Sequence, residues 1–288
     1  MSFSEEYNHP IDHLIPNLPN LEVMILGIRF DQQIKDFPPK LKRLEFVSPF
    51  DHPIKSLPPT LIKLALGWKF NQSIEFLKDL HQLVDLDLDG FFNQPISNGS
   101  ISYLPPSLIS LSFSANFNQP IEALKDLHEL VELHFGGSFN QPLSNRSYVA
   151  SGSNKRAKLS AQCYLPKVAT LSHGELLLPP NLKSLSFGGN FNQPIDSLQR
   201  LKHLEKLSFG LNFKQPIVNL PDSITNLTLP LKNLSRVINL PASLRELFIF
   251  GCRMEAVELN DYIPNRTDFD IRSDYYCIRK GISVVNKA

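Results

Sequence analysis

Apolar and polar positions along this chain repeat about every 20 to 25 residues, with one longer interval of 52 residues. Each repeat approximates LxxLxFGxxFNQPIxxLPxS, and the apolar residues at the end of LxxLxF alternate with polar ones. Such alternation predicts a short strand with one buried face. The segment FNQPI or a close variant begins at Phe50, Phe70, Phe92, Phe117, Phe139, Phe191 and Phe213.

A turn and a return segment follow each predicted strand. Glycine stands directly after the strand in several repeats, as at Gly67 and Gly188, where the chain must change direction. Most returns read IxxLPPSL, and because proline cannot donate to a sheet, we expect this side to be irregular. Longer returns begin at Ile74, Ile121 and Ile195, and their apolar residues are spaced by three. These three returns are predicted to form a turn of 3-10 or α-helix.

One repeat is too small to bury its own apolar residues, so neighbouring repeats must stack. We therefore predict a single α/β solenoid over residues 1–271, made of about twelve stacked units. Its parallel sheet is expected on the concave face, opposite mostly irregular, 3-10 or short helical returns.

Two segments depart from the repeat. Residues 144–178 form a polar insertion, in which 144–163 lack periodicity and are expected to protrude as a loop. Residues 164–178 are a candidate degenerate unit. The C-terminal residues 272–288 do not repeat but contain several apolar side chains. We expect them to cap the solenoid, because its ends would otherwise expose core.

The aromatic residue of the motif and the apolar residue four positions before it recur at equivalent places. Because neighbouring strands lie about 4.8 Å apart, we expect these side chains to stack into two rows, or spines, in the core. The first row comprises Phe30, Phe50, Phe70, Phe92, Phe117, Phe139, Phe191 and Phe213, and the second Phe46, Phe113, Phe135, Phe187 and Phe209. A row of repeated ligand sites is the alternative, but the core spacing of the apolar members favours the structural role.

The polar residues of the motif have predicted roles in the turn. The ladder residues, expected to accept hydrogen bonds from backbone donors, are Asn71, Asn93, Asn118, Asn140 and Asn192. Asp31 and Asp51 take the same place in earlier units, and ionised carboxylates can only accept. The sequence leaves the role of the glutamine that follows open, with solvation as one alternative. Proline fixes φ where the backbone leaves the sheet.

These motifs resemble a known family. LxxLxF with this period is similar to a leucine-rich repeat, and FGxxFNQPI resembles the FNIP, or FGxxFN, branch of that superfamily. The branch is known from social amoebae and giant viruses, including the one that infects Cafeteria. The resemblance covers residues 1–143 and 179–271, and it implies a leucine-rich-repeat-like solenoid. In ordinary leucine-rich repeats the asparagine stands five residues after the second leucine, whereas here Asn192 stands seven after Leu185.

Composition narrows the function classes. The chain has 288 residues, 42% of them hydrophobic, and a formal net charge of +1, which gives no reason to expect a nucleic-acid partner. Three widely spaced cysteines favour a reducing compartment without a disulfide framework. The sequence shows no apolar signal segment and no run of 18 apolar residues. We expect an intracellular protein without membrane contact, in the cytoplasm, or in the host cytoplasm if the chain is viral.

Residues that suggest catalysis are sparse. The eight histidines are scattered without paired metal-ligand spacing, and no phosphate-binding glycine loop or nucleophile motif occurs. Asp85, Asp87 and Asp89 could hold a cation, but calcium needs six to eight oxygens, so a solvated surface is favoured. We expect no enzyme activity, no cofactor and no metal.

The remaining candidate is an interaction surface. The resemblance implies that exposed strand positions line the concave face, and the candidate binding residues are Arg43, Glu45, Lys63, Asp85, Asp87, Glu132, His134 and Lys206. Their charges are mixed, which suits an unknown protein partner. The apolar residues at the ends of the solenoid could also pair with the end of a second chain, which suggests a homodimer. Family relatives can carry F-box segments, so the alternative function is a substrate adaptor for a ubiquitin ligase.

Overall fold

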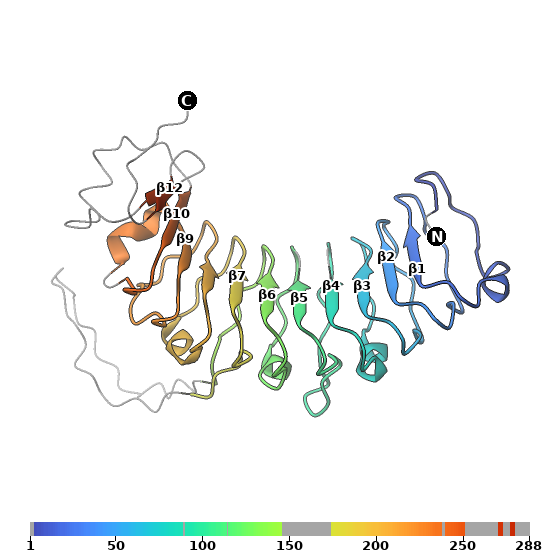
Figure 1. Cartoon of the computed structure of the whole chain (residues 1–288), viewed down its shortest axis with the longest axis horizontal. Helices are drawn as coiled ribbons and strands as arrows, with labels where there is room; N and C mark the ends of the chain where they lie inside the picture. Colours follow the sequence, from blue (N-terminus) through green and yellow to red (C-terminus); the bar gives the residue numbers. More distant parts are fainter. Residues whose placement is uncertain are drawn as a thin grey trace, which may run out of the picture.

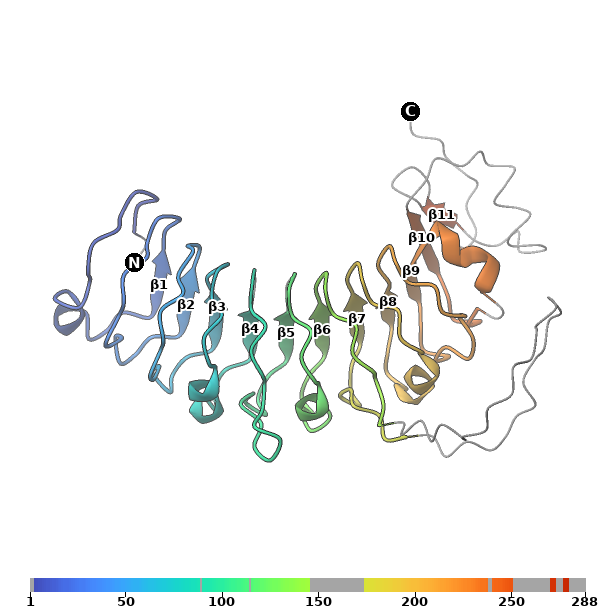
Figure 2. The same cartoon turned by 180° about the vertical axis from the view of Figure 1, so that it is seen from behind.

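The computed structural model describes residues 3–88, 90–113, 115–145, 174–237, 240–250, 270–272 and 277–279. The chain forms a solenoid that bends into an arc, as two opposite views show (Figures 1 and 2). The strands run across the arc, and the helical returns lie along its outer edge. The turns that follow the strands therefore lie along its inner edge.

The strands form one sheet whose spatial order is the order in the sequence. They are β1 (Val23–Leu26), β2 (Arg43–Phe46), β3 (Lys63–Leu66), β4 (Asp85–Leu88), β5 (Ser110–Phe113), β6 (Glu132–Phe135), β7 (Ser184–Phe187), β8 (Lys206–Ser208), β9 (Asn226–Pro230), β10 (Glu246–Phe250), β11 (Asp270–Arg272) and β12 (Cys277–Arg279). Strands β1 to β11 pair in parallel, and β12 runs antiparallel to β11 and β10. The predicted solenoid class is confirmed.

Register follows the leucine pattern. Leu86 of β4 lies opposite Leu111 of β5, and Leu133 of β6 lies opposite Leu185 of β7. Alternate residues of β4 and β5 are buried, while those between them are partly exposed. A one-residue slip would turn every buried leucine outward, so the alternation fixes the register.

Five short 3-10 helices occupy returns and turns of the described chain. They are η1 (Ile15–Asn17), η2 (Glu75–Asp79), η3 (Glu122–Leu124), η4 (Asp196–Arg200) and η5 (Leu231–Arg236). Helices η2, η3 and η4 lie in the three longer returns, which confirms the prediction made for those segments. Each buries a leucine or alanine toward the core, because apolar residues spaced by three share one face of a 3-10 helix.

The phenylalanines form a buried cluster through the core. Rings of the motif phenylalanine stack from turn to turn, at 6.1 Å between Phe92 and Phe117 and 6.3 Å between Phe117 and Phe139. Rings of the second row repeat at 5.7 Å, as between Phe113 and Phe135. Within one turn the two rows touch, with 3.9 Å between the Phe113 and Phe117 centroids. All members of both predicted rows are buried.

At two of the turns that follow a strand, close backbone contacts exclude any residue but glycine. A Cβ on Gly188 would lie 2.2 Å from the Gly136 carbonyl oxygen, and one on Gly210 would lie 2.1 Å from the Gly188 oxygen. The turns stack backbone against backbone, and only glycine permits this approach.

The count of about twelve units was slightly high, because the solenoid has about nine turns. The motif aromatic is missing from the later units, and at the end β12 reverses direction instead of adding a parallel strand. Strand β6 pairs directly with β7. The proposed loop and most of the candidate unit lie outside the described residues, as do most of the capping residues 272–288.

Candidate interaction surface

A hydrogen-bonded ladder runs beside the phenylalanine row. Asn71 Oδ1 accepts from the backbone N–H of Asn93, and Asn93 Oδ1 accepts from that of Asn118, each at 2.9 Å. Equivalent bonds of 2.8–2.9 Å join Asp51 to Asn71, Asn118 to Asn140, Asn140 to Asn192, and Asn192 to Lys214. Each side chain thus satisfies a donor in the next turn, and the ladder holds successive turns in register.

The glutamine of the motif has a second role that the sequence did not indicate. Gln119 Nε2 donates to the backbone oxygen of Asn93 at 2.8 Å and to Asn93 Oδ1 at 3.1 Å. Gln141, Gln193 and Gln215 repeat both contacts one turn further on each time. The sequence left the role of this amide open, and the contacts show that it bridges neighbouring turns. The asparagine and the glutamine of FNQPI therefore both hold neighbouring turns together.

The exposed face of the sheet carries two columns of side chains. Strand register defines them: Arg43, Lys63, Asp85, Ser110, Glu132, Ser184 and Lys206 in one, and Glu45, Ala65, Asp87, Ser112, His134, Ser186 and Ser208 in the other. The predicted surface residues therefore share one face. Five lie together on β2 to β4, whereas Glu132 and His134 lie on β6 and Lys206 lies apart on β8.

The cluster on β2 to β4 is held by ion pairs. Arg43 Nε lies 2.8 Å from Glu45 Oε1, and Lys63 Nζ lies 2.7 Å from Asp85 Oδ2. The hydrogen bond that Arg43 donates to Glu45, and then the charge of Glu45, raise the pKa of Arg43. The hydrogen bond that Lys63 donates to Asp85 raises the pKa of Lys63. Both cations keep their charge at neutral pH. These side chains are partly exposed to solvent. Each ion pair therefore orients its two side chains but contributes little to the stability of the fold.

His134 lies on the same face between Ser112 of β5 and Ser186 of β7. Part of its side chain reaches solvent, but the surrounding protein excludes enough water to lower its pKa below the ordinary 6.5. The ring is therefore neutral at pH 7. It contributes hydrogen-bonding capacity to the face, not charge.

A hollow of about 390 Å³ opens on this face over β2 to β4. Its lining is Glu45, Phe46, Val47, Lys63, Ala65, Leu66, Trp68 and Asp87. Val47 and Trp68 are exposed apolar residues that sequence analysis did not single out. The signal was available in part, because the places that correspond to Val47 hold Gly136, Gly188 and Gly210 in later turns. The places that correspond to Trp68 hold Gly137 and Gly189, with Leu211 as the exception.

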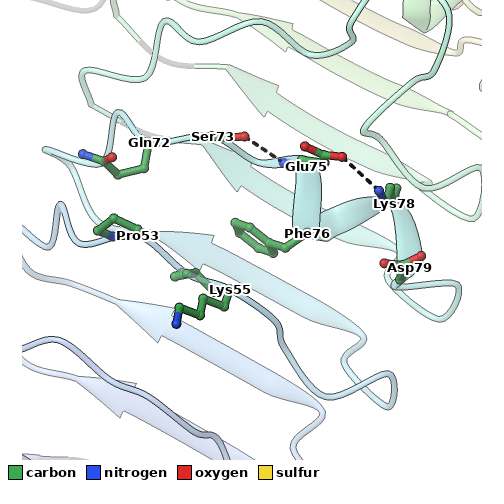
Figure 3. Close-up of a pocket in the computed structure, with 9 residues that line it drawn as sticks. Pro53, Lys55, Gln72, Ser73, Glu75, Phe76, Lys78 and Asp79 are labelled. Carbon is green, nitrogen blue, oxygen red and sulfur yellow. Dashed lines mark hydrogen bonds and ion pairs between the residues drawn. The ribbon is translucent and has the colours of Figure 1, made fainter.

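A second hollow, of about 400 Å³, lies at the outer edge between two returns (Figure 3). Its lining is Pro53, Ile54, Lys55, Gln72, Ser73, Glu75, Phe76, Lys78 and Asp79. Lys78 Nζ lies 3.0 Å from Glu75 Oε1, and the Glu75 N–H donates to Ser73 Oγ at 3.3 Å. These contacts belong to the first turn of η2. The notch arises where a short proline-rich return meets a longer helical one.

Metal-binding and membrane-spanning features were also sought in the described ranges. Within them, no three His, Cys, Asp or Glu side chains come together as a metal-ligand group. Asp85 instead pairs with Lys63, and Asp89 falls outside those ranges. No helix in the same ranges has the length and apolar character needed to cross a bilayer.

Comparisons with known proteins agree with this geometry. The family model named FNIP Repeat matches residues 92–124 and 175–199. Among solved structures, CroV588 of Cafeteria roenbergensis virus, described as a novel circular LRR protein, is 29% identical, with a TM-score of 0.58. The similarity covers 86% of this chain but only 36% of CroV588. No curated protein matches the sequence. The chain contains FNIP repeats and folds as a leucine-rich-repeat-like solenoid.

Proposed function

We propose that this chain is a non-catalytic repeat scaffold that binds another protein through the exposed face of its sheet. The observation that carries the proposal is the pair of polar columns on β2 to β8, held in register over a buried phenylalanine cluster. Stacked repeats of this kind offer extended surfaces that suit a macromolecular partner.

The chemistry of the face supports binding. Its charged groups on β2 to β4 are arranged as mutual ion pairs, and its middle strands present serine hydroxyls beside neutral His134. A partner whose charged and polar groups complement these charges and hydroxyls would be bound in preference to others. No chemical step is needed to explain their arrangement.

Site-specific photo-crosslinking tests the proposal. A photoreactive residue replaces Ser186 on the sheet face in one variant and Glu122 of η3 on the outer edge in another. Illumination in cell lysate should attach a discrete protein to the Ser186 variant and not to the Glu122 control. Capture from the control alone, or equal capture from both positions, would show that the sheet face is not the binding surface.

The ends of the arc support a second part of the proposal, a homodimer. At the N-terminal end, residues 3–6 add no strand beyond β1, and Phe3 N donates to the Ile25 oxygen at 3.1 Å. Backbone groups at an incompletely paired edge can receive another chain. Light scattering at micromolar concentration should then give twice the monomer mass. A strict monomer over this range would rule out the dimer.

A ubiquitin-ligase adaptor is the alternative function that the family resemblance suggests. The same sheet face would then hold the target while another segment holds the ligase. Pull-downs with and without added ligase components separate the two functions. An adaptor must recover the ligase components together with a target, whereas a scaffold recovers its partner without them.

A further inference from the structure

The hollow on β2 to β4 has features that define the chemistry of a partner. This inference rests on the proposed scaffold function and narrows it to one place and one kind of ligand. We propose that the hollow receives a lysine or arginine side chain from an extended segment of another protein. An apolar residue next to that basic residue covers Trp68 and its apolar neighbours.

Exposed apolar side chains occupy four successive turns at and beside the hollow, although Val23, Ile62, Ile101 and Ile109 are also exposed outside these turns. Exposed fractions are 53% for Ile28, 50% for Val47, 43% for Trp68 and 48% for Phe91. These residues lie in the four successive turns that follow β1 to β4, along the inner edge of the arc (Figure 1). Leu211, in a later turn, stands alone. Contiguous exposed apolar groups with a polar border mark interaction sites.

The floor of the hollow is shaped by Ala65. Strand register places Ala65 between Glu45 of β2 and Asp87 of β4. Since neighbouring strands lie about 4.8 Å apart, the strands that carry the two carboxylates are about 10 Å apart. An alkyl chain can lie along the alanine methyl between them. A longer side chain in place of Ala65 would fill this space.

Charge selects a cation. The carboxylates of Glu45 and Asp87 flank Ala65 in one column of the sheet face, whereas the cations Arg43 and Lys63 lie in the other column. A ligand ammonium or guanidinium group placed over Ala65 would lie between the two carboxylates. An anionic side chain would be repelled.

Trp68 adds a surface on which the alkyl stem of the basic residue can pack. Its ring packs edge-on against Phe91 with 5.8 Å between centroids, which fixes the indole at the rim. Lys69 Nζ already lies 5.1 Å from the indole centroid. An indole attracts cations through its negative face and also packs against the methylenes of a lysine or arginine stem. An apolar ligand residue then shields the rest of the ring from water.

Selection from a peptide library tests the inference with the full chain. Random dodecapeptides lacking tryptophan are displayed and selected against the immobilised protein. Trp68 is the single tryptophan of the chain, so its fluorescence reports binding of each selected peptide. We expect the enriched peptides to share a lysine or arginine next to an apolar residue. Glutamine in place of that basic residue should weaken binding at least tenfold.

Variants of the protein locate the site. The double variant Glu45→Gln/Asp87→Asn should weaken binding of the selected peptides at least tenfold, and Ala65→Arg should abolish it by filling the hollow. Glu122→Gln, in η3 on the outer edge, and Leu211→Ser, in a later turn, are matched controls that should retain affinity. Circular dichroism checks that each variant is folded.

Several results would overturn the inference. One is failure to enrich any peptide, and another is enrichment of peptides without a basic residue. Binding that survives both Glu45→Gln/Asp87→Asn and Ala65→Arg would place the peptide elsewhere, while leaving the scaffold function intact. Self-association that Ala65→Arg abolishes would make a second copy the occupant. Loss of crosslinking at Ser186 with retained peptide binding would count against the scaffold proposal instead.

Discussion

Phe91 and Phe92 are adjacent and chemically identical, yet they occupy opposite environments. Phe92 is 1% exposed and stacks at 6.1 Å on Phe117, whereas Phe91 is 48% exposed at the rim of the arc. Position relative to the strand decides the difference: Phe92 falls in the buried column of the motif, and Phe91 one residue before it.

Alanine substitution separates these two roles. Phe92→Ala leaves a cavity in the aromatic row, so the free energy of unfolding should fall by about 3–5 kcal/mol. Phe91→Ala is the matched control and should change it by less than about 1 kcal/mol, because most of its surface is already hydrated. Denaturant unfolding measures both values. Equal losses would contradict the assignment of the motif phenylalanine to the core.

Asn233 occupies the register position that phenylalanine holds in earlier turns, four residues after Leu229 of β9, as Phe92 stands four residues after Leu88. It is fully buried, and neither of its amide atoms has a hydrogen-bond partner. A buried unsatisfied polar group costs about 1–3 kcal/mol. The row of rings thus ends at Phe213, and Asn233, which holds the next place, weakens the fold locally.

Replacing Asn233 by leucine should therefore stabilise the protein. Leucine fills a similar volume and removes the desolvated amide, so the free energy of unfolding should rise by about 1–3 kcal/mol. A thermal melt followed by circular dichroism measures the change. Asn212→Leu changes an exposed asparagine and serves as control, with no gain expected. An unchanged or lower melting temperature for Asn233→Leu would mean that the buried amide is satisfied in solution.

At the scale of elements, strands were the most predictable part. Alternation in LxxLxF fixes which residues of β4 or β6 face the core, because strand side chains alternate strictly. The returns were predictable where apolar spacing changed to three, as in η2 and η4. The hollow over β2 to β4 was not predictable, since it depends on Ala65 having carboxylates on both neighbouring strands.

His134 makes the stability of the sheet depend on pH. Its pKa is lower in the folded than in the unfolded chain, so the unfolded chain binds the proton first as pH falls below about 6.5. Stability should therefore decrease with falling pH below that value. His134→Gln should remove this contribution, and denaturant unfolding between pH 7.5 and pH about 4.5 measures it. Ser186→Ala changes the neighbouring strand without removing a titratable group, so its stability should depend on pH as that of the wild type does. If this variant also lost the pH dependence, the dependence would not come from His134.

At the scale of the whole molecule, stacking makes turns interchangeable. Deleting residues 71–92 removes β4 and joins Phe70 to Asn93, which preserves the order of spine and ladder residues across the junction. Because each turn contacts mainly its neighbours, the shortened chain should still fold, with reduced stability. Circular dichroism and denaturant unfolding test this outcome.

Deletion of residues 71–81 alone is the corresponding control. It removes a ladder residue and all of η2 but retains β4, so the chain cannot complete a turn between Phe70 and the strand. Cooperative unfolding should be lost in this variant. If both deletions unfold alike, the turns are not independent stacking units.

The sequence by itself determined the solenoid, its strands, its helical returns and its buried phenylalanines, because these follow from local periodicity repeated in every unit. Only the tertiary structure decided the partners of Gln119 and the surroundings of Trp68, because both depend on residues one turn away. In FNQPI, the burial of the apolar residues can be predicted from the sequence. The hydrogen-bond partners of its two amides cannot, because they lie in the neighbouring turn and come close only when the turns stack.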